Sequence, residues 1–170
     1  VDTEPSGVKL SGYVDAGYSY NFTGSGNQSV VNGRVGEPAR GDFNLYALKL
    51  VLEKALTPEN KAQAGFRVDA FIGEDANYLN LRSYANNVDA DSNALYLEQA
   101  FAQFRVPVGN GWDWKVGKYV SILGYEVNER PANMNISYSL LFINAYSIDY
   151  TGVLTSYRWN EFLDAKLGVG

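Results

Sequence analysis

Residues 9–22 alternate between apolar and polar side chains over an unusual length. Side chains of a β-strand point to opposite faces in turn, so the pattern predicts a strand with one apolar and one polar face. A strand in a globular protein is usually about five or six residues long, whereas a strand that crosses a bilayer needs about 9–11 residues. The apolar face meets either a protein core or lipid, and the length of the pattern favours lipid.

The same alternation recurs along the rest of the chain. It predicts about seven strands in all, over residues 9–22, 43–54, 62–73, 95–106, 112–123, 147–158 and 163–170. The connections between these strands are alternately long and short. The long ones are 23–42, 74–93 and 125–145, and the short ones are LTPENK at 56–61, PVGNG at 107–111 and the turn at 159–162. An up-and-down outer-membrane barrel has short turns on one side and longer loops on the other.

Aromatic residues gather near both ends of the predicted strands. Tyr18, Tyr20, Phe22 and Tyr46 fall near the long loops, and Phe104, Trp112, Trp114, Tyr157 and Trp159 fall near the short turns. Two aromatic girdles around an apolar band are typical of membrane interfaces; the alternative is that these residues form the core and corners of a soluble barrel. We therefore expect an all-β fold, an antiparallel up-and-down transmembrane β-barrel, in one domain over residues 1–170.

The polar face of the strands carries the residues that would line a water-filled lumen. These candidates are Asp15, Lys49, Glu53, Arg67, Asp69, Gln99, Gln103, Arg105 and Lys115. Mixed charges across a lumen select among polar solutes; the alternative is that they pair as structural supports with no selective role. Glu98 breaks the pattern, because it falls on the apolar face with Ala100 and Ala102. We expect Glu98 at the headgroup level, where charge costs little.

The third long loop, over residues 124–145, is the candidate constriction of the lumen. It contains Glu126, Glu129 and Arg130 together with the apolar run SLLFINA. Apolar residues in an outer loop need cover, and folding into the barrel mouth would provide it. The alternative is an external loop that packs on a neighbouring subunit.

Composition argues against most other classes of protein. The net charge is −5 and no basic patch is present, so we expect no nucleic-acid partner. The chain has no Cys and no His, and it shows no activated nucleophile or carboxylate pair, so we expect neither an enzyme nor a cofactor. DADSN at 89–93 starts like a calcium loop, but Ala94 and Ala100 stand where Gly and Glu are needed, so we expect no metal site.

Several segments resemble the outer-membrane β-barrel porins of the type 2 family. They are LSGYVDAGYSYNF, FRVDAFIGEDA, YLEQAFAQFRVPVGNGWDWKVGKYVSILGYEV, RPANMNISYSLLF and YTGVLTSY, of which GKYVSILGYEV and PANMNISYSLLF are the most specific. The resemblance implies a Gram-negative outer-membrane barrel in contact with lipid, and by analogy a homotrimer. Family members are longer, and this chain stops inside a predicted strand. We expect the N-terminal part of a larger barrel; the alternative is that several chains complete one barrel.

The expected function is a porin through which small hydrophilic solutes or ions diffuse passively. The alternative is a structural or scaffolding barrel that is plugged or that sheaths a partner protein, such as an electron-transfer chain. A soluble β-barrel that binds an apolar ligand is a third possibility, and it would stay in solution without detergent.

Overall fold

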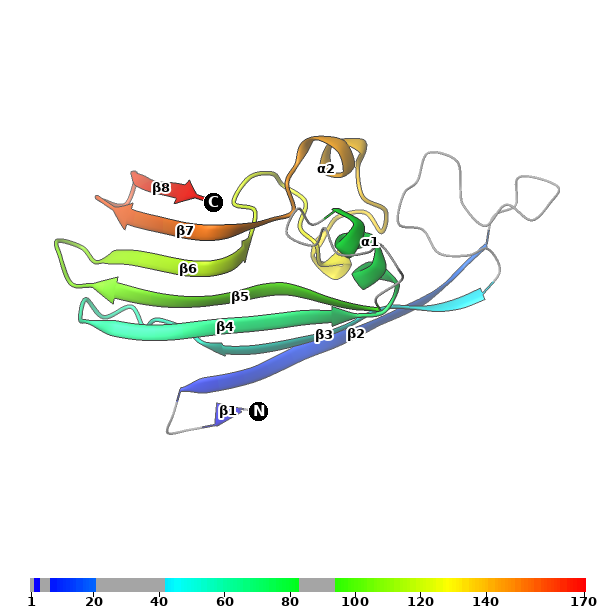
Figure 1. Cartoon of the computed structure of the whole chain (residues 1–170), viewed down its shortest axis with the longest axis horizontal. Coiled ribbons are helices and arrows are strands. Elements are labelled where there is room, and N and C mark those ends of the chain that lie inside the picture. The colour runs from blue at the N-terminus through cyan, green and yellow to red at the C-terminus, as the bar shows by residue number, and fades with distance from the viewer. Residues whose placement is uncertain (1, 4–6, 21–41, 83–93) are drawn as a thin grey trace.

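The strands form one antiparallel sheet in which each strand pairs with its neighbours in the chain (Figure 1). The computed structural model describes residues 2–3, 7–20, 42–82 and 94–170. The strands are β1 (Asp2–Thr3), β2 (Val8–Ser19), β3 (Asp42–Lys54), β4 (Gln63–Ile72), β5 (Leu95–Val106), β6 (Trp112–Val120), β7 (Asp149–Arg158) and β8 (Asp164–Val169). Strands β2 to β8 correspond to the seven predicted strands, and the two-residue β1 is an addition that was not predicted. The order β1 to β8 confirms the predicted all-β, antiparallel, up-and-down architecture.

The short connections lie at one end of the sheet, and the helices lie at the other end (Figure 1). The short turns join β3 to β4, β5 to β6 and β7 to β8. In the β5–β6 turn, Gly109 and Gly111 have φ angles of 59° and 97°, which only glycine adopts readily. The described connections therefore keep the predicted alternation of long and short.

Three helical segments occupy regions that the sequence predicted as loops. They are α1 (Glu74–Arg82), the 3-10 helix η1 (Arg130–Ala132) and α2 (Leu140–Ala145). Glu74 and Asp75 in the first turn of α1 suit the positive end of the helix dipole. Ser139 caps α2 by accepting a hydrogen bond from the backbone N–H of Phe142. In the described part of the chain, no helix has the length and apolar character needed to cross a membrane.

One face of the sheet is apolar and points away from the helices. Its side chains include Val14, Leu50 and Leu167, which are 68%, 47% and 70% exposed. A soluble monomer rarely exposes a continuous apolar face of this kind. We call this the outer face.

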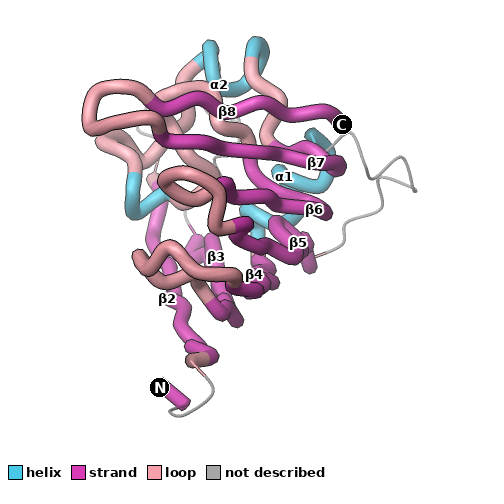
Figure 2. Tube along the Cα trace, turned by 90° about the vertical axis from the view of Figure 1, so that its left-hand side faces the viewer, coloured by secondary structure: helices cyan, strands magenta, loops and turns pink. Residues whose placement is uncertain are grey.

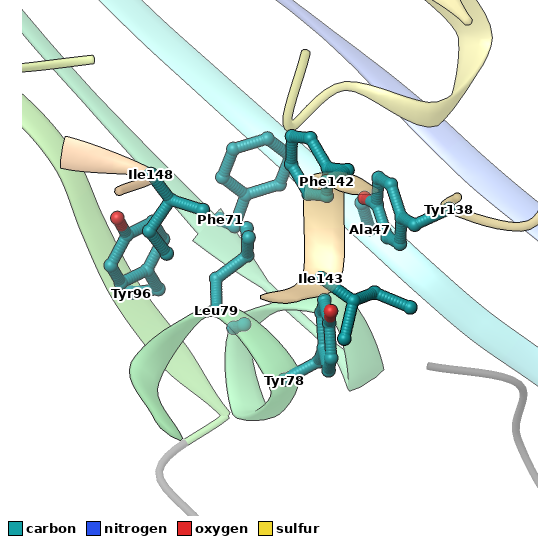
Figure 3. Close-up of a cluster of buried hydrophobic side chains, with 10 residues drawn as sticks. Ala47, Phe71, Tyr78, Leu79, Tyr96, Tyr138, Phe142, Ile143 and Ile148 are labelled. Atoms are coloured by element: carbon teal, nitrogen blue, oxygen red, sulfur yellow. The ribbon is translucent and has the colours of Figure 1, made fainter. Parts of the chain in front are cut away.

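The opposite face, here called the inner face, is covered at one end by α1 and by residues 121–148. Viewed from its end, the sheet curves from β2 to β8 (Figure 2). Side chains of the strands pack there against both helices (Figure 3). This core consists of Ala47, Phe71, Ala76, Tyr78, Leu79, Tyr96, Tyr138, Phe142, Ile143 and Ile148.

Candidate functional site

The predicted lumen-facing residues lie together on the inner face. Strand pairing sets Glu53 opposite Arg67, Asp69 opposite Gln99, Gln103 opposite Lys115, and Arg105 opposite Asp113. Asp15 follows two residues after Tyr13, which pairs with Lys49. Because side chains two apart on a strand share a face, the register brings all the candidates to one surface. Whether this surface lines a pore stays a prediction.

Lys49 is the centre of a buried ion network at the helix end of this face. Its ammonium donates to Glu98 at 2.5 Å and to Glu129, and it lies 3.6 Å from Asp69. Asn128 donates to the other oxygen of Glu98 at 2.8 Å. Lys49 and Glu98 are 2% and 0% exposed. Each charge has lost its hydration, and only the attraction of the opposite charge offsets that cost. Glu129 comes from the third long loop, and the network therefore ties that loop to the sheet.

Glu98 does not lie at the headgroup level, and that expectation is wrong. The β4–β5 register shifts between Asp69 and Ala70, so that Asp69 pairs with Gln99 and Ala70 pairs with Leu97. Glu98 is the extra residue of this β-bulge, and both Glu98 and Gln99 are buried on the inner face. The bulge turns a charge inward that strict alternation would have sent into lipid.

A second ion cluster extends the network along β4. Arg67 donates to Asp69 through two nitrogens, at 2.9 and 2.7 Å, and to Glu53 at 3.2 Å. Gln99 also donates to Asp69, at 3.0 Å. The side chains of Arg67 and Glu53 are each 28% exposed, so this cluster reaches from the buried network toward the open part of the inner face.

Arg130 forms the second attachment of the third long loop. Its Nε donates to both carboxylate oxygens of Asp75, at 2.7 and 2.9 Å. Its guanidinium lies between two aromatic rings, 4.9 Å from the centre of Tyr46 and 5.0 Å from the centre of Tyr138. Burial raises the pKa of Asp75 to about 6, although the positive charge of Arg130 acts in the opposite direction. Burial, with the nearby Asp75 charge, also raises the pKa of Tyr138.

Tyr46 lies on the inner face rather than on the predicted aromatic girdle. It is 7% exposed, whereas its neighbour Leu45 is 44% exposed. The β2–β3 register shifts here, because Asp15 pairs with Ala47 and Ala16 pairs with Leu45. Tyr46 is the extra residue of this second bulge, which explains why the alternation assigned it to the wrong face.

The other predicted girdle residues lie near the two ends of the sheet. Tyr18 packs against Phe43 at the helix end, with ring centres 5.1 Å apart, and Tyr20 is 52% exposed. At the turn end, the ring contacts join Phe104 to Trp114, Trp112 to Trp114, and Tyr157 to Trp159. Phe22 lies outside the described residues. A role of these rings at a membrane interface remains a prediction.

The three candidate constriction residues make different contacts. Glu129 and Arg130 attach the loop to Lys49 and Asp75, as described above. Glu126 instead makes a contact within the loop, because its carboxylate accepts a hydrogen bond from the backbone N–H of Ser139 at 3.0 Å. Asp75 was not among the residues predicted from the sequence, and its place in the first turn of a helix becomes a signal only once α1 is known.

Toward the turn end, the buried ion network of the inner face gives way to separate contacts. Arg105 donates to both oxygens of Asp113, at 2.6 and 2.7 Å. Lys115 instead lies over the ring of Phe101, 4.7 Å from its centre. Within residues 2–3, 7–20, 42–82 and 94–170, no group of three or more carboxylates is arranged to hold a metal ion. DADSN at 89–93 falls outside that range.

The charged groups of the site are held mostly by one another, as in the Lys49–Glu98, Arg67–Asp69 and Arg130–Asp75 pairs. The Glu126 carboxylate instead accepts a hydrogen bond from the Ser139 hydroxyl.

The model of a family described as "putative beta-barrel porin-2, OmpL-like" matches residues 7–170. No curated protein matches the chain. No solved structure matches it either.

Proposed function

Because the chain belongs to the beta-barrel porin-2, OmpL-like family, we propose that it forms an outer-membrane channel for passive diffusion of small hydrophilic solutes or ions. The observation that carries the proposal is the division of the sheet into an apolar outer face and a charged inner face. In a membrane barrel such a division puts lipid outside and water inside.

The third long loop is proposed to narrow the channel. Part of this loop, residues 124–145, packs on the inner face, where the Lys49–Glu129 and Asp75–Arg130 pairs hold it. Its apolar residues Phe142 and Ile143 join the core with α1, so the loop is fixed against one wall rather than hanging in the lumen. A loop fixed in this way sets an aperture of constant size.

Closure of the barrel is part of the proposal. Among the described residues, β8 pairs with β7 alone, and β1 pairs with β2 alone. Unpaired backbone groups in lipid cost several kcal/mol each, so both edges would pair with further strands of the same polypeptide or of another copy. Comparing the mass of the folded protein from outer membranes with that of its denatured chain separates these two sources.

Single-channel recording in planar bilayers tests the channel directly. Arg67→Gln and Glu53→Gln remove opposite charges from partly exposed positions of the inner face. We expect them to shift the cation-to-anion permeability ratio about two- to fivefold in opposite directions, as charges at partly screened sites do. Lys54→Gln is the matched control, because Lys54 pairs with Phe66 on the outer face. A barrel that inserts but passes no current would contradict the proposal and favour a plugged or scaffolding role.

A further inference from the structure

Two lysines of the inner face differ from the other cations of the site described above. Lys49, Arg67, Arg105 and Arg130 each lie in an ion pair. Lys115 and Lys166 have no ion-pair partner among the described residues. An inner-face cation with no carboxylate partner is a natural contact for an anion in the lumen. Of the two, Lys115 also lies over the ring of Phe101.

The strand register brings these two lysines to one region of the wall. Lys115 pairs with Leu154 on β7, and Leu154 pairs with Gly168 on β8. Lys166 precedes Gly168 by two residues and so shares its face. The positive charges of Lys166 and Arg67 both act on Lys115.

Two carboxylates of this face lie near the lysines, and each is set against an arginine. Asp164, two residues before Lys166, pairs across the strands with Arg158. Asp113, two residues before Lys115, is held by Arg105 through two short hydrogen bonds. The charge of Asp113 still acts on Lys115, and the positive charge of Arg105 balances it within the pair. The Lys115–Lys166 region therefore keeps a net positive charge.

An apolar hollow of about 270 Å³ lies beside the two lysines. It is lined by Tyr119, Tyr150, Leu154, Gly168 and Gly170, and by Ile122 and Leu123 just before the third long loop. The rings of Tyr119 and Tyr150 have centres 6.2 Å apart. A methyl group at Gly168 would come within 3.3 Å of the Tyr119 hydroxyl and 3.4 Å of Leu154, so glycine keeps this space open.

We propose that this part of the wall binds a small organic anion with an apolar body, of the class of aromatic carboxylates. Its carboxylate would lie between Lys115 and Lys166, and its ring would enter the hollow against Tyr119, Tyr150 and Leu154. The inference rests on the proposed channel function and names the solute class of that channel. Chloride and acetate lack the apolar body, and a neutral aromatic alcohol lacks the charge. Each of them should therefore bind more weakly at this site than an aromatic carboxylate.

The test measures how benzoate affects chloride current through the assembled channel in planar bilayers. We expect benzoate to reduce the current at concentrations where acetate and benzyl alcohol do not. In Lys115→Gln and Lys166→Gln, the half-blocking concentration should rise at least about tenfold, as expected for loss of a charge-assisted hydrogen bond. Lys54→Gln, on the outer face, should leave it unchanged.

The outcomes separate this inference from the proposed function. A channel that conducts but shows no preference for benzoate over acetate overturns the anion site and leaves the channel intact. If the protein passes no current, saturation-transfer NMR of benzoate with the detergent-solubilised protein decides whether the anion site exists. Binding that Lys115→Gln weakens would support the site without a channel, and absence of binding would overturn it.

Discussion

At the residue scale, the buried Lys49 matters more than any one of its partners. Lys49→Met would leave Glu98, which is fully buried, without its cation. We expect a loss of about 3–5 kcal/mol in the free energy of unfolding, as for a broken buried pair. Glu98→Gln should cost less, about 1–2 kcal/mol, because Lys49 keeps Glu129 and Asp69. Urea unfolding of the protein in detergent measures both. Equal effects of the two substitutions would show that Lys49 does not organise the network.

The direction of most inner-face side chains could be predicted from alternation alone, because a strand's period of two is local. Alternation failed at Tyr46 and Glu98 for a common reason. A bulge inserts one residue and reverses the phase beyond it, and only the partner strand reveals where that happens. At each bulge, two adjacent residues are both buried, whereas strict alternation would expose one of them. These pairs are Tyr46 with Ala47 and Glu98 with Gln99.

At the element scale, α1 should show a pH dependence that comes from Asp75. Burial raises its pKa from the ordinary 3.8 to about 6, so the folded protein binds this proton more tightly than the unfolded chain. The contribution of Asp75 to stability is therefore full below about pH 4 and is lost as the pH rises through 6. Relative to Asp75→Asn, the wild-type free energy of unfolding should fall by up to about 3 kcal/mol between pH 4 and 7. Urea unfolding at both values checks this, and parallel curves for the two proteins would contradict it.

The helices escaped prediction because their sequences are largely polar or short. In α1, the sequence EDANYLNLR buries three apolar side chains in the core, Ala76, Tyr78 and Leu79, all within about one turn. A stripe this narrow is weak evidence when read alone. The attachments of the third long loop were equally hidden, because Arg130 and Asp75 are 55 residues apart in the chain.

At the scale of the whole molecule, the sheet was predictable and the packing on its inner face was not. Strand length and the alternation of long and short connections are both local in sequence, and together they specify an up-and-down sheet. The core between α1, α2 and the strands depends on contacts such as Lys49 with Glu129, across 80 residues. Contacts between residues so far apart leave no pattern in any one segment of the sequence.

The two faces of the sheet make the sharpest test of the whole architecture. Leu50 lies on the outer face in the middle of β3, and Ser11 lies on the inner face of β2, opposite Val51. In a lipid-embedded barrel, Leu50→Arg should cost about 2–4 kcal/mol of the free energy of unfolding in lipid vesicles, because a charge would enter the hydrocarbon. Ser11→Arg, exposed on the inner face, should cost much less. If instead Leu50→Arg is tolerated as well as Ser11→Arg, the outer face meets water, and the membrane interpretation of both faces fails together.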